Sequence, residues 1–213
     1  MKIFDFLITL YICNLRWKVF SLIKKNIIMA ATESNMLALG TKAPYFQLYD
    51  TVRKDMVSLD DIRSDKATVV MFICNHCPYV HHVMPRLLEV AREYMKKGVS
   101  FVAISSNDIE NYPQDHPDIM NIMAGMCHFP FPYLYDETQD VARSYKAACT
   151  PDFYVFDKDL KLAYRGRFDD TRPQSGREAT GKDLINALDA LLAGKPVDER
   201  QFPSIGCSIK WKK

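Results

Sequence analysis

The 213-residue sequence has little net charge, and this argues against a nucleic-acid-binding protein. Its formal net charge is +2, from 28 basic and 26 acidic residues, and no basic stripe suggests binding of nucleic acid. Five basic side chains and one acidic one give residues 1–28 a charge of +4, which leaves −2 for the rest. Internal repeats and low-complexity runs are also missing. We therefore expect a globular protein without a nucleic-acid partner.

A long hydrophobic run is missing too, even in the N-terminal extension, residues 1–28. Its apolar segment is interrupted by Asp5 and Asn14 and is too short for a confident membrane span. Three interpretations stay open: Met29 is the natural initiator, the extension is an export signal or anchor, or it is a surface amphipathic helix. We expect a cytoplasmic protein, with export or membrane anchoring through residues 1–28 as the alternative.

Cysteines are too few for a disulfide-scaffolded secreted fold, since six occur in the whole chain. Two of them, Cys74 and Cys77, form a C-x-x-C pair, and no second pair is present to complete a structural zinc site. His76 and His81 allow a three-ligand cluster to be drawn, but helix geometry would send His76 away from its neighbours. We expect no metal or other cofactor, and keep a metal-binding or metal-delivery protein as an alternative.

What the sequence does contain is the alternation of strand and helix patterns typical of an α/β protein. Apolar, β-branched runs at Ala67 to Ile73 and Val99 to Ser105 predict strands buried on both faces. Between them, apolar residues from Val80 to Ala91 recur with helical spacing. These patterns predict a mixed sheet with helices on both faces. The other expected elements are a strand at 133–136, a hairpin at 152–168, and helices at about 117–126, 138–148 and 181–194.

The C-x-x-C pair lies between the first of these strands and the helix that follows. We expect Cys74 at the start of the helix, where unpaired N–H groups and the helix dipole favour a thiolate. Cys77, one turn further in, would be more buried and within disulfide reach, as the resolving thiol. His76 would add a donor or a positive charge beside the thiolate. The pattern predicts a thiol-disulfide oxidoreductase.

Four further residues are candidates for the same site. Thr150-Pro151 stands directly before a strand, which suggests a turn or edge with a cis peptide bond. Its backbone would then be available for pairing with a substrate chain. Cys149 is next to it and is either an auxiliary redox thiol or a buried bystander. Cys207 could be a second auxiliary thiol if the C-terminal tail folds back over the site.

Four segments together resemble thioredoxin-like proteins of the redoxin group, the alkyl hydroperoxide reductase/thiol-specific antioxidant family. They are ICNHCPYV, FPFPYLYDETQDVARSYKAACTPDFYVFD, YRGRFDDTRP and GCSIKWKK. The resemblance runs from about Gly40 to Lys213, so we expect residues 35–213 to form one domain. It implies a thioredoxin fold, with Cys74 and Cys77 as the redox pair and Pro151 as the cis-proline.

Two departures from related patterns bear on the activity. Thioredoxins carry Trp before the first cysteine and Gly-Pro between the two, whereas Ile73 and the dipeptide Asn-His stand here. Peroxiredoxins place Thr or Ser three residues before the peroxidatic cysteine, a slot that holds Met71 before Cys74 and Cys74 before Cys77. We therefore expect disulfide exchange, with a thiol-dependent, antioxidant peroxidase as the alternative. The expected partners are a disulfide- or thiol-containing protein or small molecule and a cellular thiol reductant or oxidant.

Overall fold

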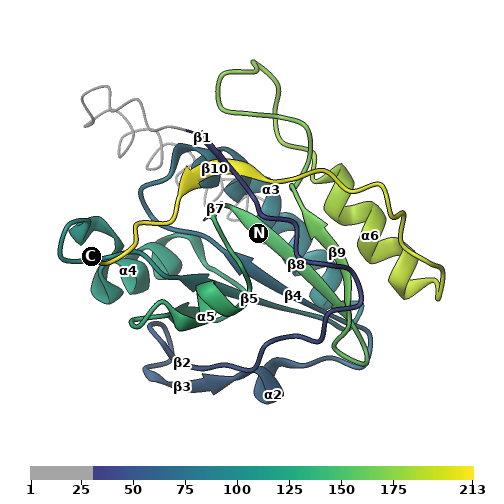
Figure 1. Ribbon diagram of the computed structural model, residues 1–213, viewed down its shortest axis with the longest axis horizontal. Coiled ribbons are helices and arrows are strands. Elements are labelled where there is room, and N and C mark those ends of the chain that lie inside the picture. Colours follow the sequence, from purple (N-terminus) through teal and green to yellow (C-terminus); the bar gives the residue numbers. More distant parts are fainter. Residues whose placement is uncertain (1–30) are drawn as a thin grey trace, which may run out of the picture.

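The computed structural model describes residues 31–213, so the predicted extension, residues 1–28, lies outside the described residues. Within residues 31–213, no helix is both long and apolar enough to cross a membrane. The strands of the main sheet are β2 (Gln47–Asp50), β3 (Asp55–Ser58), β4 (Ala67–Phe72), β5 (Val99–Ser105), β6 (Tyr133–Tyr135), β8 (Asp152–Asp157) and β9 (Leu162–Gly166). Their order in the sheet is β3-β2-β6-β5-β4-β8-β9, and Figure 1 shows β5, β4 and β8 in the middle of the molecule.

The centre of the sheet is formed by the strands that the apolar runs predict. β4 is buried at every position, and it pairs in parallel with β5, with Val70 opposite Val102. On its other side β4 pairs antiparallel with β8, which places Val70 opposite Tyr154. β8 continues into β9 as the predicted antiparallel hairpin. The mixed sheet is therefore confirmed, and both faces of its central strand are covered, as a continuous apolar run requires.

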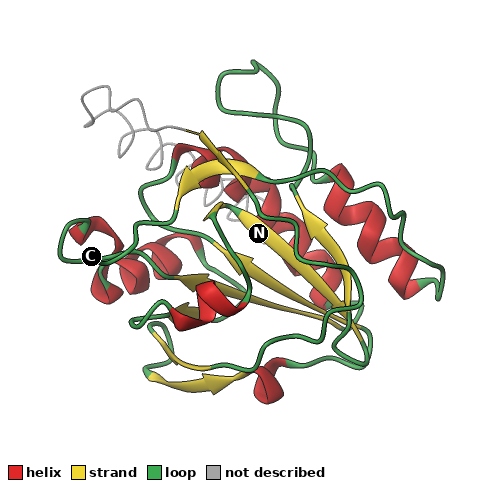
Figure 2. Cartoon of the chain, viewed as in Figure 1, coloured by secondary structure: helices red, strands yellow, loops and turns green. Residues whose placement is uncertain are grey.

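Helices lie on both faces of the sheet and create two cores (Figure 2). Successive residues of a strand point to opposite faces, so Met71 belongs to one core and Phe72 to the other. The helix expected over 138–148 is shorter, because Gln139 and Lys146 adopt left-handed backbone, with φ of 67° and 51°. The first core is covered by α3 (Pro78–Met95), α4 (Pro117–Cys127) and α6 (Lys182–Leu192), and the second by α2 (Leu59–Ile62) and α5 (Asp140–Ser144).

A small second sheet, which we did not predict, joins the two ends of the described chain. It consists of β1 (Ala31–Glu33), β10 (Ile205–Ser208) and β7 (Cys149–Thr150), with β10 in the middle. Both pairings are antiparallel, and they place Cys207 opposite Thr150 on one side and opposite Ala31 on the other. In Figure 1 β10 lies between β1 and β7, so the C-terminal tail folds back over the body of the protein.

Candidate active site

Cys74 and Cys77 lie between β4 and α3, as predicted, but the helix begins later than expected. α3 starts at Pro78, and Cys77 is its N-cap residue with extended backbone, φ −80° and ψ 121°. Asn75 and His76 form a turn that precedes the helix. The expectation that Cys74 occupies the helix N-terminus is therefore wrong. Because this turn separates the two cysteines, Cys77 takes that position.

Both sulfurs are buried, and both contact Thr150. The exposed fractions are 1% for Cys74 and 0% for Cys77. Cys74 Sγ lies 3.4 Å from the hydroxyl oxygen of Thr150, and protonated Cys77 donates to the Thr150 carbonyl oxygen at 3.1 Å. The Thr150-Pro151 peptide bond is cis, which confirms that prediction. The strand end around Thr150 therefore closes the site from the side opposite the helix.

The surroundings drive the pKa values of the two thiols apart. Burial raises the pKa of Cys74 well above its ordinary value, and a hydrogen bond with Cys77 and the charge of Asp115 raise it further. Burial also opposes ionisation of Cys77, but the thiols of Cys207 and Cys74 and the backbone amides of Val80 and Cys207 lower its pKa well below the ordinary value. These surroundings favour ionisation of Cys77 over that of Cys74, whereas the sequence placed the thiolate on Cys74.

The tail brings a third sulfur to the pair. Cys207 Sγ lies 2.7 Å from Cys77 Sγ, and the Cys207 side chain is 1% exposed. The fold-back of the tail, which we considered only as a condition for a role of Cys207, is thus confirmed. The Cys149 thiol instead lies 3.8 Å from the carbonyl oxygen of Ser204, and burial raises its pKa. Of the two candidate auxiliary thiols, the structure brings Cys207 into contact with the pair.

His76 faces a buried carboxylate. Its Nδ1 lies 2.5 Å from Asp115 Oδ2, and its ring stacks on that of Tyr112 with centroids 5.5 Å apart. The same carboxylate oxygen accepts a hydrogen bond from Asn107 Nδ2, and the other accepts one from the backbone amide of Asn75, both at 2.8 Å. Asp115 therefore holds both residues of the turn that separates the cysteines.

This arrangement also bears on the metal alternative. Cys74, His76 and Asp115 are buried, and each offers a ligand atom within 4.8 Å of the others. His76 does not point away from its neighbours as we expected, because it lies in a turn and not in the helix. However, both oxygens of Asp115 already accept hydrogen bonds, which a bound ion would have to displace. The donor set is therefore arranged for hydrogen bonding.

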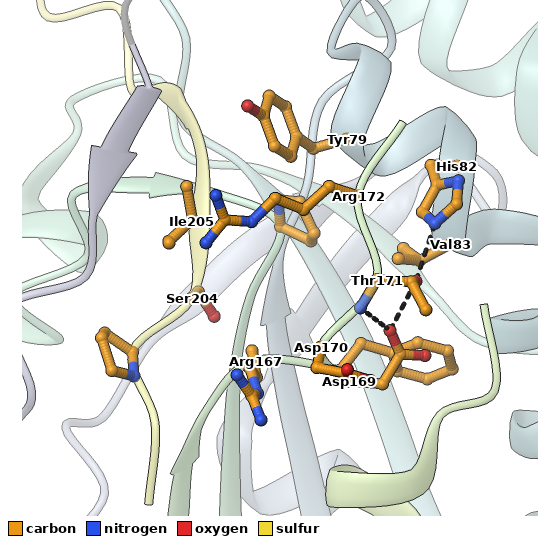
Figure 3. A pocket seen from close by; sticks show the side chains of 13 residues that line it. Tyr79, His82, Val83, Arg167, Asp169, Asp170, Thr171, Arg172, Ser204 and Ile205 are labelled. Carbon is orange, nitrogen blue, oxygen red and sulfur yellow. Dashed lines mark hydrogen bonds between the residues drawn. The ribbon is translucent and has the colours of Figure 1, made fainter. Parts of the chain in front are cut away.

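A cleft of about 50 Å³ lies beside the site (Figure 3). Pro151 lines it from the cysteine side, and Tyr79 and His82 line it from the first turns of α3. Figure 3 shows His82 Nε2 directed at the hydroxyl of Thr171, 2.8 Å away, which in turn donates to Asp169 Oδ1 at 2.6 Å. Neither Cys74 nor Cys77 lines the cleft, which adjoins the cysteine site through Pro151.

Three residues of the site were not identified from the sequence: Asp115, Asn107 and Gly206. Asp115 is 40 positions from the turn that it holds, and no local pattern marks it. Gly206 does carry a signal, because a glycine inside a strand often marks a close backbone approach. A Cβ atom at this position would lie 2.0 Å from the carbonyl oxygen of Thr150.

The chain is similar in sequence to one protein family and in structure to several solved proteins. Residues 39–165 match the model of the AhpC/TSA family. An uncharacterized conserved protein from Geobacillus kaustophilus is 60% identical, with a TM-score of 0.85 over 86% of this chain and 97% of that one. A hypothetical protein from Sinorhizobium meliloti is 42% identical, with a TM-score of 0.83 over 85% of this chain and 98% of that one. The thioredoxin domain of a thiol-disulfide oxidoreductase from Bacteroides vulgatus shares the fold at 21% identity, with a TM-score of 0.50 over 64% and 91% of the two chains. A search of curated proteins gives no match.

Proposed function

Because the chain belongs to the AhpC/TSA family of thioredoxin-like redoxins, whose members are oxidoreductases, we propose that it exchanges disulfides through Cys77. The observation that carries this proposal is the environment of Cys77 Sγ. It stands at the N-terminus of α3, where amide dipoles and two neighbouring thiols stabilise the thiolate. Cys74 is in hydrogen-bonding contact with it and supplies the second sulfur of the pair.

The reaction is two successive thiol–disulfide exchanges. The Cys77 thiolate attacks one sulfur of a substrate disulfide, the substrate S–S bond breaks, and the other substrate sulfur leaves as a thiolate. Cys74 then loses its proton to the departing sulfur and attacks Cys77 Sγ, which forms the Cys74–Cys77 disulfide and releases the second substrate thiol. The substrate gains two electrons and the cysteine pair loses two. A cellular thiol reductant restores the pair by the reverse steps.

The substrate must reach a buried sulfur, and this limits how it binds. A substrate chain cannot simply pair with Thr150, as the sequence suggested, because β10 already pairs there. The cleft beside Pro151 offers a second approach, between α3 and the loop that carries Arg172. We expect the substrate to enter from this cleft or to displace β10.

Replacing each cysteine in turn tests the proposal. Cys77→Ser should lower the reduction of a small aromatic disulfide to the background rate, because the attacking thiolate is lost. Cys74→Ser should still release at least one equivalent of aromatic thiolate, because the first step needs Cys77 alone. Cys127→Ser is the matched control, as a buried cysteine that lies in α4. Wild-type activity in the Cys77 variant would contradict the proposal.

Peroxide reduction is a second candidate, and the burial of Cys77 favours it. A peroxide needs less room to reach a buried sulfur than a protein disulfide does. The thiolate would attack one peroxide oxygen, break the O–O bond, and leave a sulfenic acid on Cys77 and a molecule of water or alcohol. Catalysed loss of hydrogen peroxide, with a sulfenic acid trapped by dimedone on Cys77, would support this activity. Peroxide loss no faster than with the Cys77→Ser variant would exclude it.

A further inference from the structure

Strand β10 pairs with the backbone of β7 beside the cysteine pair, where another extended chain could otherwise bind. It runs antiparallel to β7, and the residue opposite Cys207 is Thr150. Thr150 is also the residue that contacts both Cys74 and Cys77. A segment of the chain's own C-terminus is therefore held where an extended chain can present a cysteine to the pair.

The contact between β10 and β7 is closer than most side chains would allow. Gly206 packs against the Thr150–Pro151 backbone, and a Cβ atom there would lie 2.0 Å from the Thr150 carbonyl oxygen and 2.7 Å from its carbonyl carbon. Beyond the strand, Ile209 is buried, and its backbone amide donates to the carbonyl of Ala148. The position of Cys207 is thus fixed by strand pairing on one side and by a docked tail on the other.

Within this frame the Cys207 sulfur faces the sulfur of Cys77. The two Sγ atoms are 2.7 Å apart, and both side chains are almost fully buried. The backbone amide of Cys207 also stabilises the Cys77 thiolate. Cys149 lies one residue from Thr150, yet its thiol is directed to the carbonyl of Ser204. Proximity to the redox pair is therefore a property of Cys207 that Cys149 does not share.

We propose that Cys207 is a third redox residue, which forms a disulfide with Cys77 during the reaction cycle. The inference rests on the proposed role of Cys77. After Cys77 has formed a mixed disulfide with the substrate, the Cys207 sulfur attacks Cys77 Sγ. The Cys77–Cys207 bond forms, the mixed disulfide breaks, and the Cys207 proton passes to the departing substrate thiolate. No oxidant other than the substrate disulfide is needed.

Two disulfides can then exchange within the protein. Cys74 can attack Cys77 Sγ, which forms the Cys74–Cys77 bond and returns the proton to Cys207. The number of electrons held by the three cysteines does not change in this step. Cys77 takes part in both bonds, so only one of them can exist at a time. The Cys77–Cys207 bond attaches strand β10 covalently to the start of α3, and the Cys74–Cys77 bond leaves β10 unattached.

Tryptic peptides distinguish the two bonds directly. Cys74 and Cys77 lie together in the peptide Ala67–Arg86, and Cys207 lies in Gln201–Lys210. The reduced full-length protein would be treated with oxidised glutathione, blocked with N-ethylmaleimide, digested and analysed by mass spectrometry. A Cys77–Cys207 bond joins the two peptides, whereas a Cys74–Cys77 bond leaves Gln201–Lys210 separate and blocked.

We expect the joined peptides in the wild type and, in higher yield, in the Cys74→Ser variant. Cys207→Ala should give only the bond within Ala67–Arg86, and Cys127→Ala, the matched control, should behave like the wild type. Fragmentation of the joined wild-type peptides shows which sulfur is linked, so the result does not depend on a variant folding. In Cys74→Ser/Cys207→Ala, glutathione should stay attached to Cys77.

Two other results would overturn the inference, and they differ in what else they overturn. If Cys74→Ser carries glutathione on Cys77 while Cys207 is blocked by maleimide, Cys207 is not a redox residue, but Cys77 still exchanges disulfides as proposed. If Cys77 stays unmodified in the wild type and in every variant, both the inference and the proposed function fail.

Discussion

Replacing Asp115 by asparagine removes a buried negative charge that raises the pKa of Cys74. We expect the pKa of Cys74 to fall, although burial will keep it above the ordinary value. The variant should also lose about 1–3 kcal/mol of stability, because the amide cannot accept all three hydrogen bonds that the carboxylate accepts. The pH dependence of Cys74 alkylation, with the modified sulfur assigned by mass spectrometry, measures the first effect.

Asp118→Asn is the control for this change, because Asp118 lies three residues away with an 87% exposed side chain. It should leave the alkylation profile of Cys74 unchanged. If Asp115→Asn folds and the midpoint for Cys74 stays where it is or moves to higher pH, the carboxylate does not act on this thiol. The role of Asp115 would then be limited to holding His76 and the turn.

Asp152 links stability to pH. It is fully buried, and burial raises its pKa to about 6, against the opposing effects of Arg165 and of a hydrogen bond from Tyr154. In the unfolded chain an aspartate has an ordinary pKa near 3.9, so between about pH 4 and 6 the folded state holds a proton that the unfolded state has lost. The free energy of unfolding should therefore fall by roughly 3 kcal/mol as the pH rises through this window.

Urea denaturation at pH 4, 5, 6 and 7 measures this contribution. The Asp152→Asn variant cannot release the proton, so its stability should change less with pH than that of the wild type. Asp159→Asn, at an exposed turn position, should keep the wild-type dependence. A wild-type stability that rises steadily from pH 4 to 7 by the same amount in all three proteins would rule out this role for Asp152.

At the scale of elements, the start of α3 shows what local patterns can and cannot predict. The apolar spacing from Val80 onward identified the helix, and Pro78 marked its first turn. The position of Cys77 at its N-cap could not be predicted, because the turn before it is held by Asp115, which comes from another part of the chain. The expected position of Cys74 at the helix N-terminus was wrong for this non-local reason.

Gly206→Ala tests how closely β10 must approach β7. A methyl group would meet the Thr150 carbonyl, so the two strands have to move apart. We expect a loss of about 1–3 kcal/mol, as for other overpacked sites. We also expect faster alkylation of Cys77, because the strand that covers it opens more often. Hydrogen exchange of the amides of residues 205–208 should accelerate in parallel.

Gly125→Ala is the matched control, since this glycine lies in α4 and a Cβ there would meet nothing within 4 Å. It should raise stability slightly, by up to about 1 kcal/mol, because alanine has the higher helix propensity. It should not change the alkylation rate of Cys77. Equal alkylation rates in the two variants would mean that access to the sulfur does not depend on β10.

For the whole molecule, the sequence was informative where structure is set by patterns along the chain. The mixed sheet, its central strands and the helices on both faces follow from apolar runs and helical spacing. The small sheet could not be predicted in the same way, because β10 pairs with β1, at the N-terminal end of the described chain, and with β7 at Cys149–Thr150. Its strands are short, and their register depends on packing that a single sequence does not reveal.

This long-range pairing has a thermodynamic consequence if Cys77 and Cys207 become linked. The two residues are 130 positions apart, so a bond between them closes a long loop, and chain-entropy arguments give a stabilisation of about 5 kcal/mol. A bond between Cys74 and Cys77 closes a very short loop, for which the same argument gives about 2 kcal/mol. The two oxidised forms should therefore differ in stability by about 3 kcal/mol.

Urea denaturation of two variants, each reduced and oxidised, isolates the two bonds. Cys74→Ser can form only the long-range bond of the pair, and Cys207→Ala only the short one. Oxidation should raise the free energy of unfolding more in the first variant than in the second, and Cys127→Ala should show that an unrelated cysteine contributes nothing. An equal gain in both variants would mean that strain in the folded state offsets the extra stabilisation expected for the long-range bond. A loss in the first variant would mean that this strain exceeds the whole stabilisation.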